Sequence, residues 1–257
     1  MGTEFFGERP PLVLLHGLSF DRHQWSPVGA ELARLDPGRR VLALDLPGHG
    51  ASVARRRYGL DEVARTIHDA VVDAGLDAPV VVGHSLGGVL ATMYAAAYPT
   101  RGVVNVDQPL LPGGFATMLR RVKPVLRGPD YAQVWQSLMD RMGVDLLPPD
   151  ARRLVEATGT PEQDLLLGYW NELLTEPAER LVDRRKSDLA IIRAGGVAYH
   201  YVTGAEPDPA YRRWLEAALP DVAVTVLPGS GHFPHLAHPR EVAGILAATG
   251  VSSMPRR

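Results

Sequence analysis

Six short apolar runs, rich in β-branched residues, constrain the fold of this chain more than any other feature of its sequence. Each run is apolar on both faces instead of alternating with polar residues, and ends at or near Gly, Asp or Ser. This pattern is typical of strands in a parallel sheet that helices cover on both sides. The runs lie at residues 11–17, 40–48, 79–85, 102–108, 196–204 and 222–232.

Helical patterns of the right length for crossovers between parallel strands separate most of these runs. They span residues 60–75, 87–98 and 209–219, and the last two are stopped by Pro99 and Pro220. The sequence therefore predicts an α/β fold with a mostly parallel central sheet flanked by helices.

One interval, residues 110–193, contains no convincing strand. Apolar residues from Tyr131 to Met142 recur with helical spacing on one face, and the stretch Thr160-Pro161-Glu162-Gln163 resembles the capping-box start of a second helix. We expect a core made of residues 1–109 and 194–257, interrupted by a helical insertion. The apolar face of the insertion either packs it onto the core or roofs a ligand pocket, and both can hold.

Composition excludes several classes of function. The 257 residues carry a formal net charge of −2 without an extended basic cluster, which argues against nucleic acid as a partner. The chain has no cysteine, so disulfides, a thiol nucleophile and zinc–thiolate sites are excluded. Because it shows neither a signal-peptide pattern at the N-terminus nor a run of about 18 apolar residues, we expect a cytoplasmic protein without membrane insertion.

The nucleophile is predicted from the segment Gly83-His84-Ser85-Leu86-Gly87. It has the pattern G-x-S-x-G and lies between an apolar strand and an Ala-rich helix, the context that gives this motif its meaning. The strand-to-helix turn is so tight that glycine is required two residues before and after the serine. The alternative, that Ser85 only caps a helix, explains less of the pattern.

A serine hydroxyl needs a base to remove its proton, and His232 is the candidate. It follows the last predicted strand and precedes the final helix. His235 and His238 come next at helical spacing, which raises the alternative of a metal site. Proline residues interrupt that stretch and no carboxylate pattern joins it, so we expect no metal and no cofactor.

Two backbone N–H groups are also needed to stabilise a developing oxyanion. Leu86, directly after the serine, is one candidate donor. Leu18, in the loop that follows the first predicted strand, is the other. His16 at the start of that loop is interpreted as a structural residue.

The segments LLHGLSFDRHQW, DLPGHGAS, VVGHSLGGVLA and PGSGHFPHLAHP, in this order, resemble the α/β-hydrolase fold superfamily, in particular small bacterial esterases, perhydrolases and C–C hydrolases. The resemblance covers residues 1–108 and 194–257. It implies that residues 110–193 form the cap, or lid, which varies most in that superfamily. Ser85 argues against the dehalogenase and epoxide hydrolase branches, which use Asp at this position.

Three carboxylates are candidates for the acid that should orient His232. In most members of the superfamily it lies three residues after the glycine of YVTG, but Pro207 occupies that position here, flanked by Glu206 and Asp208. Asp208 precedes a proline and a helical run, so helix capping explains it fully. Asp107 ends the strand after the nucleophile helix, a position from which a minority of the superfamily takes its acid. We therefore favour Asp107, although an Asx-type turn into Pro109 would also explain it.

These residues predict a cofactor-free serine hydrolase that cleaves a carboxylic ester, lactone or thioester as a small-molecule substrate. The predicted catalytic residues are Ser85, His232 and Asp107, with Leu18 and Leu86 as oxyanion donors. Other chemistry on the same triad (C–C hydrolysis, a lyase reaction or perhydrolysis) and a non-enzymatic ligand receptor remain alternatives. The sequence predicts neither the natural substrate nor the oligomeric state.

Overall fold

A computed structural model describes residues 9–250 of the chain. Residues 1–8, on which the expectation of a missing signal segment rests, and residues 251–257 lie outside the described part. Among the described residues, no helix has both the length and the apolar character needed to cross a membrane.

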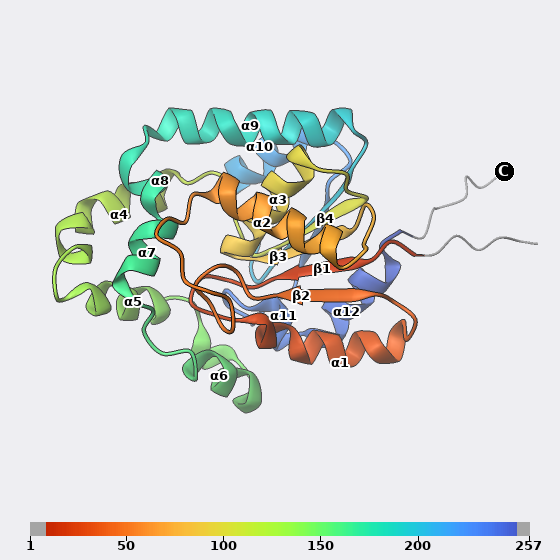
Figure 1. Cartoon of the computed structure of the whole chain (residues 1–257), viewed down its shortest axis with the longest axis horizontal. Coiled ribbons are helices and arrows are strands. Elements are labelled where there is room, and N and C mark those ends of the chain that lie inside the picture. The colour runs from red at the N-terminus through yellow and green to blue at the C-terminus, as the bar shows by residue number, and fades with distance from the viewer. Residues whose placement is uncertain (1–8, 251–257) are drawn as a thin grey trace, which may run out of the picture.

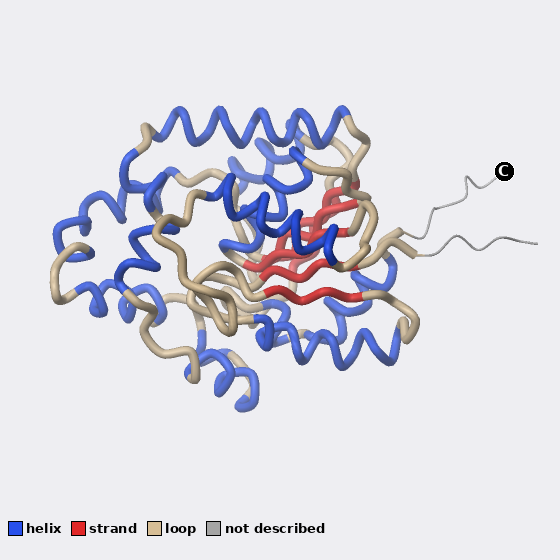
Figure 2. Tube along the Cα trace, viewed as in Figure 1, coloured by secondary structure: helices blue, strands red, loops and turns tan. Residues whose placement is uncertain are grey.

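The core is a six-stranded sheet in which every neighbouring pair of strands is parallel. The strand order is β2-β1-β3-β4-β5-β6. Figure 1 labels β1 to β4, and Figure 2 shows the strands of the sheet in red among the helices. The strands are β1 (Leu12–Leu15), β2 (Val41–Leu44), β3 (Val80–His84), β4 (Gly102–Val106), β5 (Ala198–Thr203) and β6 (Ala223–Val226). Each lies within one of the six apolar runs, so the predicted α/β fold is confirmed.

The two faces of the sheet are covered by different helices, as successive side chains of a strand point to opposite faces. Leu12 and Leu14 pack in a cluster with α1 (Ser26–Leu35) and α12 (Pro239–Ala248). Val13 and Leu15 pack in the opposite cluster. The helices of that second face are α2 (Leu60–Asp73), α3 (Leu86–Ala97), α9 (Ala178–Ala194) and α10 (Pro209–Ala218) (Figure 1). This double cover explains why the strands are apolar on both faces.

Helices also fill the chain between β4 and β5. They are α4 (Gly113–Leu126), α5 (Tyr131–Met139), η2 (Val144–Leu146), α6 (Pro149–Glu156), α7 (Gln163–Tyr169), α8 (Asn171–Thr175) and the long α9. Figure 1 shows α4 to α8 gathered beyond one end of the sheet, while α9 runs back over α3. Leu189 and Ile192 of α9 are buried in the core cluster, so this helix ties the segment to the core.

The start of α7 differs from the sequence prediction. The helix begins at Gln163, and its N-cap Glu162 makes no side-chain capping bond, so the predicted capping box at Thr160 is wrong. The Gln163 side chain instead donates to the carbonyls of Leu126 and Gly128, at 2.9 and 2.8 Å. A tertiary contact with the end of α4 has replaced the local cap.

Candidate active site

Ser85 occupies a sharp turn between β3 and α3. Its backbone has φ 52° and ψ −120°, a strained conformation for a residue with a side chain. A Cβ atom on Gly83 would lie 1.9 Å from the Gly87 carbonyl oxygen, and one on Gly87 would lie 2.3 Å from the Leu15 oxygen. The turn therefore requires glycine at both positions, which is the physical basis of the G-x-S-x-G pattern.

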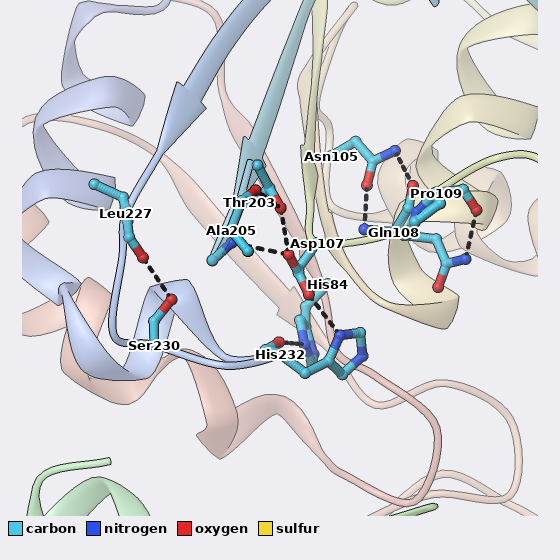
Figure 3. A network of polar contacts seen from close by, with 11 residues as sticks. His84, Asn105, Asp107, Gln108, Pro109, Thr203, Ala205, Leu227, Ser230 and His232 are labelled. Carbon is cyan, nitrogen blue, oxygen red and sulfur yellow. Dashed lines mark hydrogen bonds and ion pairs between the residues drawn. The ribbon is translucent and has the colours of Figure 1, made fainter. Parts of the chain in front are cut away.

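Asp107 and His232 are in direct contact, although 125 positions separate them in the sequence. The Nδ1–H group of His232 donates to Asp107 Oδ2 at 2.7 Å, and both side chains are largely buried (Figure 3). Because a carboxylate can only accept, the proton of the neutral ring lies on Nδ1 and leaves Nε2 free to accept one. This is the tautomer that a general base needs.

Further donors hold the carboxylate of Asp107. Its Oδ1 accepts from the Thr203 hydroxyl at 2.7 Å and from the Gly204 N–H at 2.9 Å, both at the end of β5 (Figure 3). Burial by itself raises the pKa of Asp107, but the hydrogen bond and charge of His232, with the donors from Gly204 and Thr203, outweigh it and hold the pKa below its ordinary value of 3.8. Asp107 is thus an ionised, fully bonded acceptor.

The two rival acids lie elsewhere. Asp208 is the N-cap of α10, and its carboxylate accepts from the N–H groups of Ala210 and Tyr211 at 2.8 and 3.2 Å. Glu206 is an exposed side chain that forms an ion pair with Arg212 at 3.5 Å. Of the three candidate acids, the structure brings only Asp107 to His232.

Side chains pin the loop that carries Leu18. His16 is buried, donates to the Gly17 carbonyl and accepts from the Leu46 N–H. Burial, followed by the nearby His49, lowers the pKa of His16 to about 3, so its ring stays neutral. His49 Nε2 accepts from the Ser19 N–H, at a residue whose φ is 72°. Among the described residues, the N–H groups of Leu18 and Leu86 have no hydrogen-bond acceptor.

A cavity of about 830 Å³ brings these groups together. Ser85, His232, Asp107, Leu18 and Leu86 all line it. Most of the remaining wall is apolar, and its aromatic members are Phe20, Phe115, Trp135, Tyr169 and Trp170. The last four come from the chain between β4 and β5. A mostly apolar hollow with a few polar groups is the usual form of a small-molecule site.

Comparison with known proteins assigns the fold to a family. The Alpha/beta hydrolase family matches residues 12–245, nearly the whole described chain. The protein belongs to the alpha/beta hydrolase family. The resemblance drawn from the four sequence segments is confirmed at this level.

The relatives of this alpha/beta hydrolase are named for different activities. It is 29% identical over 247 residues to a 2-succinyl-6-hydroxy-2,4-cyclohexadiene-1-carboxylate synthase of Enterobacter sp. (strain 638), covering 93% of this chain and 90% of that protein. It is 24% identical to a pimeloyl-[acyl-carrier protein] methyl ester esterase of Nitrosospira multiformis, with coverage of 92% and 93%. A thermophilic esterase from Thermogutta terrifontis shares the fold, with a TM-score of 0.74, 20% identity and coverage of 93% and 89%.

Three neighbours of the predicted site residues were not foreseen from the sequence of this alpha/beta hydrolase. Thr203 holds Asp107, the Met142 carbonyl accepts from the His232 N–H at 2.8 Å, and His84 contacts the His232 carbonyl at 2.8 Å. Thr203 belongs to the stretch YVTG, whose pattern points to a nearby acid and not to the donors that hold one. Contacts with main-chain atoms leave no signal in a single sequence.

The other two histidines near the C-terminus, His235 and His238, contact other parts of the protein than His232 does. His235 is fully buried in α11 (Pro234–Ala237), and its ring packs at a tilt near the rings of Trp25 and His84. His238 donates from Nε2 to the Pro228 carbonyl at 3.0 Å. Neither ring contacts the carboxylate of Asp107 through a hydrogen bond among the described residues.

Proposed function

We propose that this protein is a serine hydrolase that cleaves a carboxylic ester, lactone or thioester through an acyl-enzyme. The observation that carries the proposal is the 2.7 Å hydrogen bond between His232 Nδ1 and Asp107 Oδ2, beside a strained serine in one cavity. A supported imidazole that lines the same cavity as a serine hydroxyl is the arrangement from which nucleophilic acyl transfer can start.

In the proposed mechanism Ser85 Oγ attacks the carbonyl carbon of the substrate while His232 Nε2 accepts its proton. Asp107 stabilises the resulting imidazolium by remaining ionised. The N–H groups of Leu18 and Leu86 donate to the oxyanion, which is consistent with their having no acceptor among the described residues. His232 then protonates the leaving group, and water, deprotonated by His232, releases the acyl group from Ser85.

The proposal includes a cap formed by residues 110–193. Trp135 and Trp170 of this segment line the cavity together with Ser85, and Tyr169 donates from its hydroxyl to the Pro47 carbonyl of the core at 2.8 Å. The segment would exclude water from the acyl-enzyme and supply apolar surface for the substrate.

Covalent labelling with a fluorophosphonate, followed by peptide mapping, tests the proposal directly. We expect the wild-type protein to be labelled at Ser85 and to hydrolyse members of a panel of acyl esters graded in chain length. Ser85→Ala should abolish labelling and lower ester hydrolysis by on the order of 10⁴- to 10⁶-fold. Asp208→Asn is the folded control, since it lies outside the cavity. A wild-type protein that neither labels nor hydrolyses any ester, lactone or thioester would refute the proposal.

A lyase reaction on the same residues is the second candidate. The 29% identity to a protein named as a synthase favours it, as the match runs over 93% of the chain. Labelling of Ser85 without hydrolysis of any ester, lactone or thioester would support this candidate over the first.

A further inference from the structure

His84, the residue before the predicted nucleophile, makes one hydrogen bond that the proposed mechanism does not use. It is the last residue of β3, its side chain is fully buried, and its Nε2 lies 2.8 Å from the main-chain carbonyl oxygen of His232 (Figure 3). A carbonyl oxygen can only accept, so the ring donates from Nε2 and is the Nε2–H tautomer. Burial, followed by the neighbouring His235 and His232 rings, lowers the pKa of His84 and keeps it neutral.

The main chain of His232 is thereby held at both of its polar atoms. Its N–H donates to the Met142 carbonyl at 2.8 Å, while its carbonyl accepts from His84. Gly231, at φ 53°, lets the two segments approach, because a Cβ there would lie 2.3 Å from the Met142 oxygen. The only side-chain donor in this pair of bonds is His84, and it is covalently adjacent to Ser85.

We propose that His84 is a positioning residue that couples the location of His232 to that of Ser85. Its hydrogen bond to the His232 carbonyl joins the strand that presents the nucleophile to the loop that presents the base. This inference rests on the proposed function, in which His232 is that base. His84 also packs against the loop that carries Leu18, since a Cβ on Gly17 would lie 2.8 Å from His84 Nδ1.

His235 provides a matched comparison. It is equally buried, its ring centroid lies 4.3 Å from that of His84, and burial, followed by His232, lowers its pKa to about 3. Both of its ring nitrogens lack a hydrogen-bond partner among the described residues. The two histidines therefore share surroundings and protonation, and they differ in the bond to His232.

The experiment replaces both residues by methionine, a flexible side chain that fills apolar gaps, and His84 also by glutamine, which keeps an N–H donor. We expect His84→Met to lower kcat/KM by about 10- to 100-fold, mainly through kcat, and to slow fluorophosphonate labelling of Ser85 in parallel. His84→Gln should recover most of the loss. His235→Met should keep the wild-type kcat/KM.

The proposal would be overturned if His235→Met lowered kcat/KM as much as His84→Met does, or if a folded His84→Met kept the wild-type kcat/KM. It would also be overturned if kcat/KM fell as far in His84→Gln as in His84→Met. A measurement on the wild-type protein covers the case in which the variants do not fold. We expect an NMR coupling across the hydrogen bond between ¹⁵N-labelled His84 Nε2 and the ¹³C-labelled His232 carbonyl, and its absence would refute the bond. The NMR coupling tests the hydrogen bond, whereas labelling of Ser85 tests the proposed function. Failure of the one can therefore be told apart from failure of the other.

Discussion

The turns that follow β4 and β5 each carry an aspartate, two residues before Pro109 in the first and directly before Pro209 in the second, yet they use it differently. Asp107 after β4 has φ 54° and directs its carboxylate to Thr203, Gly204 and His232. Asp208 after β5 is exposed and caps the N-terminus of α10. The first carboxylate serves side chains and main chain from distant parts of the sequence, and the second serves its own helix.

The difference arises from what else closes each turn. After β4, Asn105 takes the local role: its Oδ1 accepts from the Gln108 N–H at 3.2 Å and its Nδ2 donates to the Gln108 carbonyl at 2.9 Å (Figure 3). The side-chain hydrogen bonds that close this turn thus come from Asn105, and the described hydrogen bonds of the Asp107 carboxylate are all long-range. After β5 no such substitute is present among the described hydrogen bonds, and Asp208 must cap the helix itself.

Replacing each aspartate by asparagine gives the largest contrast. In Asp107→Asn the amide cannot stabilise an imidazolium and can impose the wrong tautomer on His232, so we expect kcat for ester hydrolysis to fall by about 10⁴-fold. Asp208→Asn should leave it unchanged, because Asn caps helices as well as Asp. Steady-state kinetics on both variants decides between Asp107 and Asp208 as the acid. The reverse result would place the acid in the turn after β5.

The support of Asp107 by β5 should have a smaller effect. Thr203→Val removes the hydroxyl that donates to Oδ1 but leaves the Gly204 N–H, so we expect kcat to fall by about 10-fold. Thr203→Ser keeps the hydroxyl and should retain activity. Equal kinetics in the valine and serine variants would show that the hydroxyl contributes nothing.

In the turn after β5, loss of the aspartate should affect stability. Asp208→Ala removes the acceptor for two N–H groups at the start of α10, and we expect the free energy of unfolding to fall by about 1 kcal/mol. Chemical denaturation measures this loss, and kcat should not change. If kcat fell in Asp208→Ala under conditions where the variant is fully folded, the purely structural role of this turn would be contradicted.

The subtlest contrast is in the response to acid. The pKa of Asp107 is lowered in the folded protein, so its contribution to stability is present above the ordinary value of 3.8 and is lost as the pH falls through the lower, folded value. On acidification below about pH 4 the wild-type protein should therefore lose more unfolding free energy than Asp107→Asn. Denaturation curves at a series of pH values measure this. If Asp107 made no such contribution, the unfolding free energy would depend on pH equally in the wild-type protein and in Asp107→Asn.

Much of this architecture was predictable from local patterns. Six apolar runs placed all six strands, and the residues around Ser85 predicted a turn whose crowding explains both glycines. Asp107 could be favoured because Pro207 occupies the usual position and Asp208 has a capping role, but whether it acts as the acid stays a prediction. The start of α7 was missed because a contact with α4 overrode the local sequence. Bonds from His84 and Met142 depend on main-chain atoms brought together by the fold.

The pairing of β3 with β4 has a consequence for altering this chain. These strands are neighbours in register, His84 opposite Val106, so the serine and the aspartate that follow them are fixed by one strand pair. With Asp107 as the proposed acid, the stretch from Glu206 to Asp208 need not supply one. New chain termini or a grafted peptide could enter there, beyond Gly204, while the proposed triad stays intact, at the cost of one helix cap.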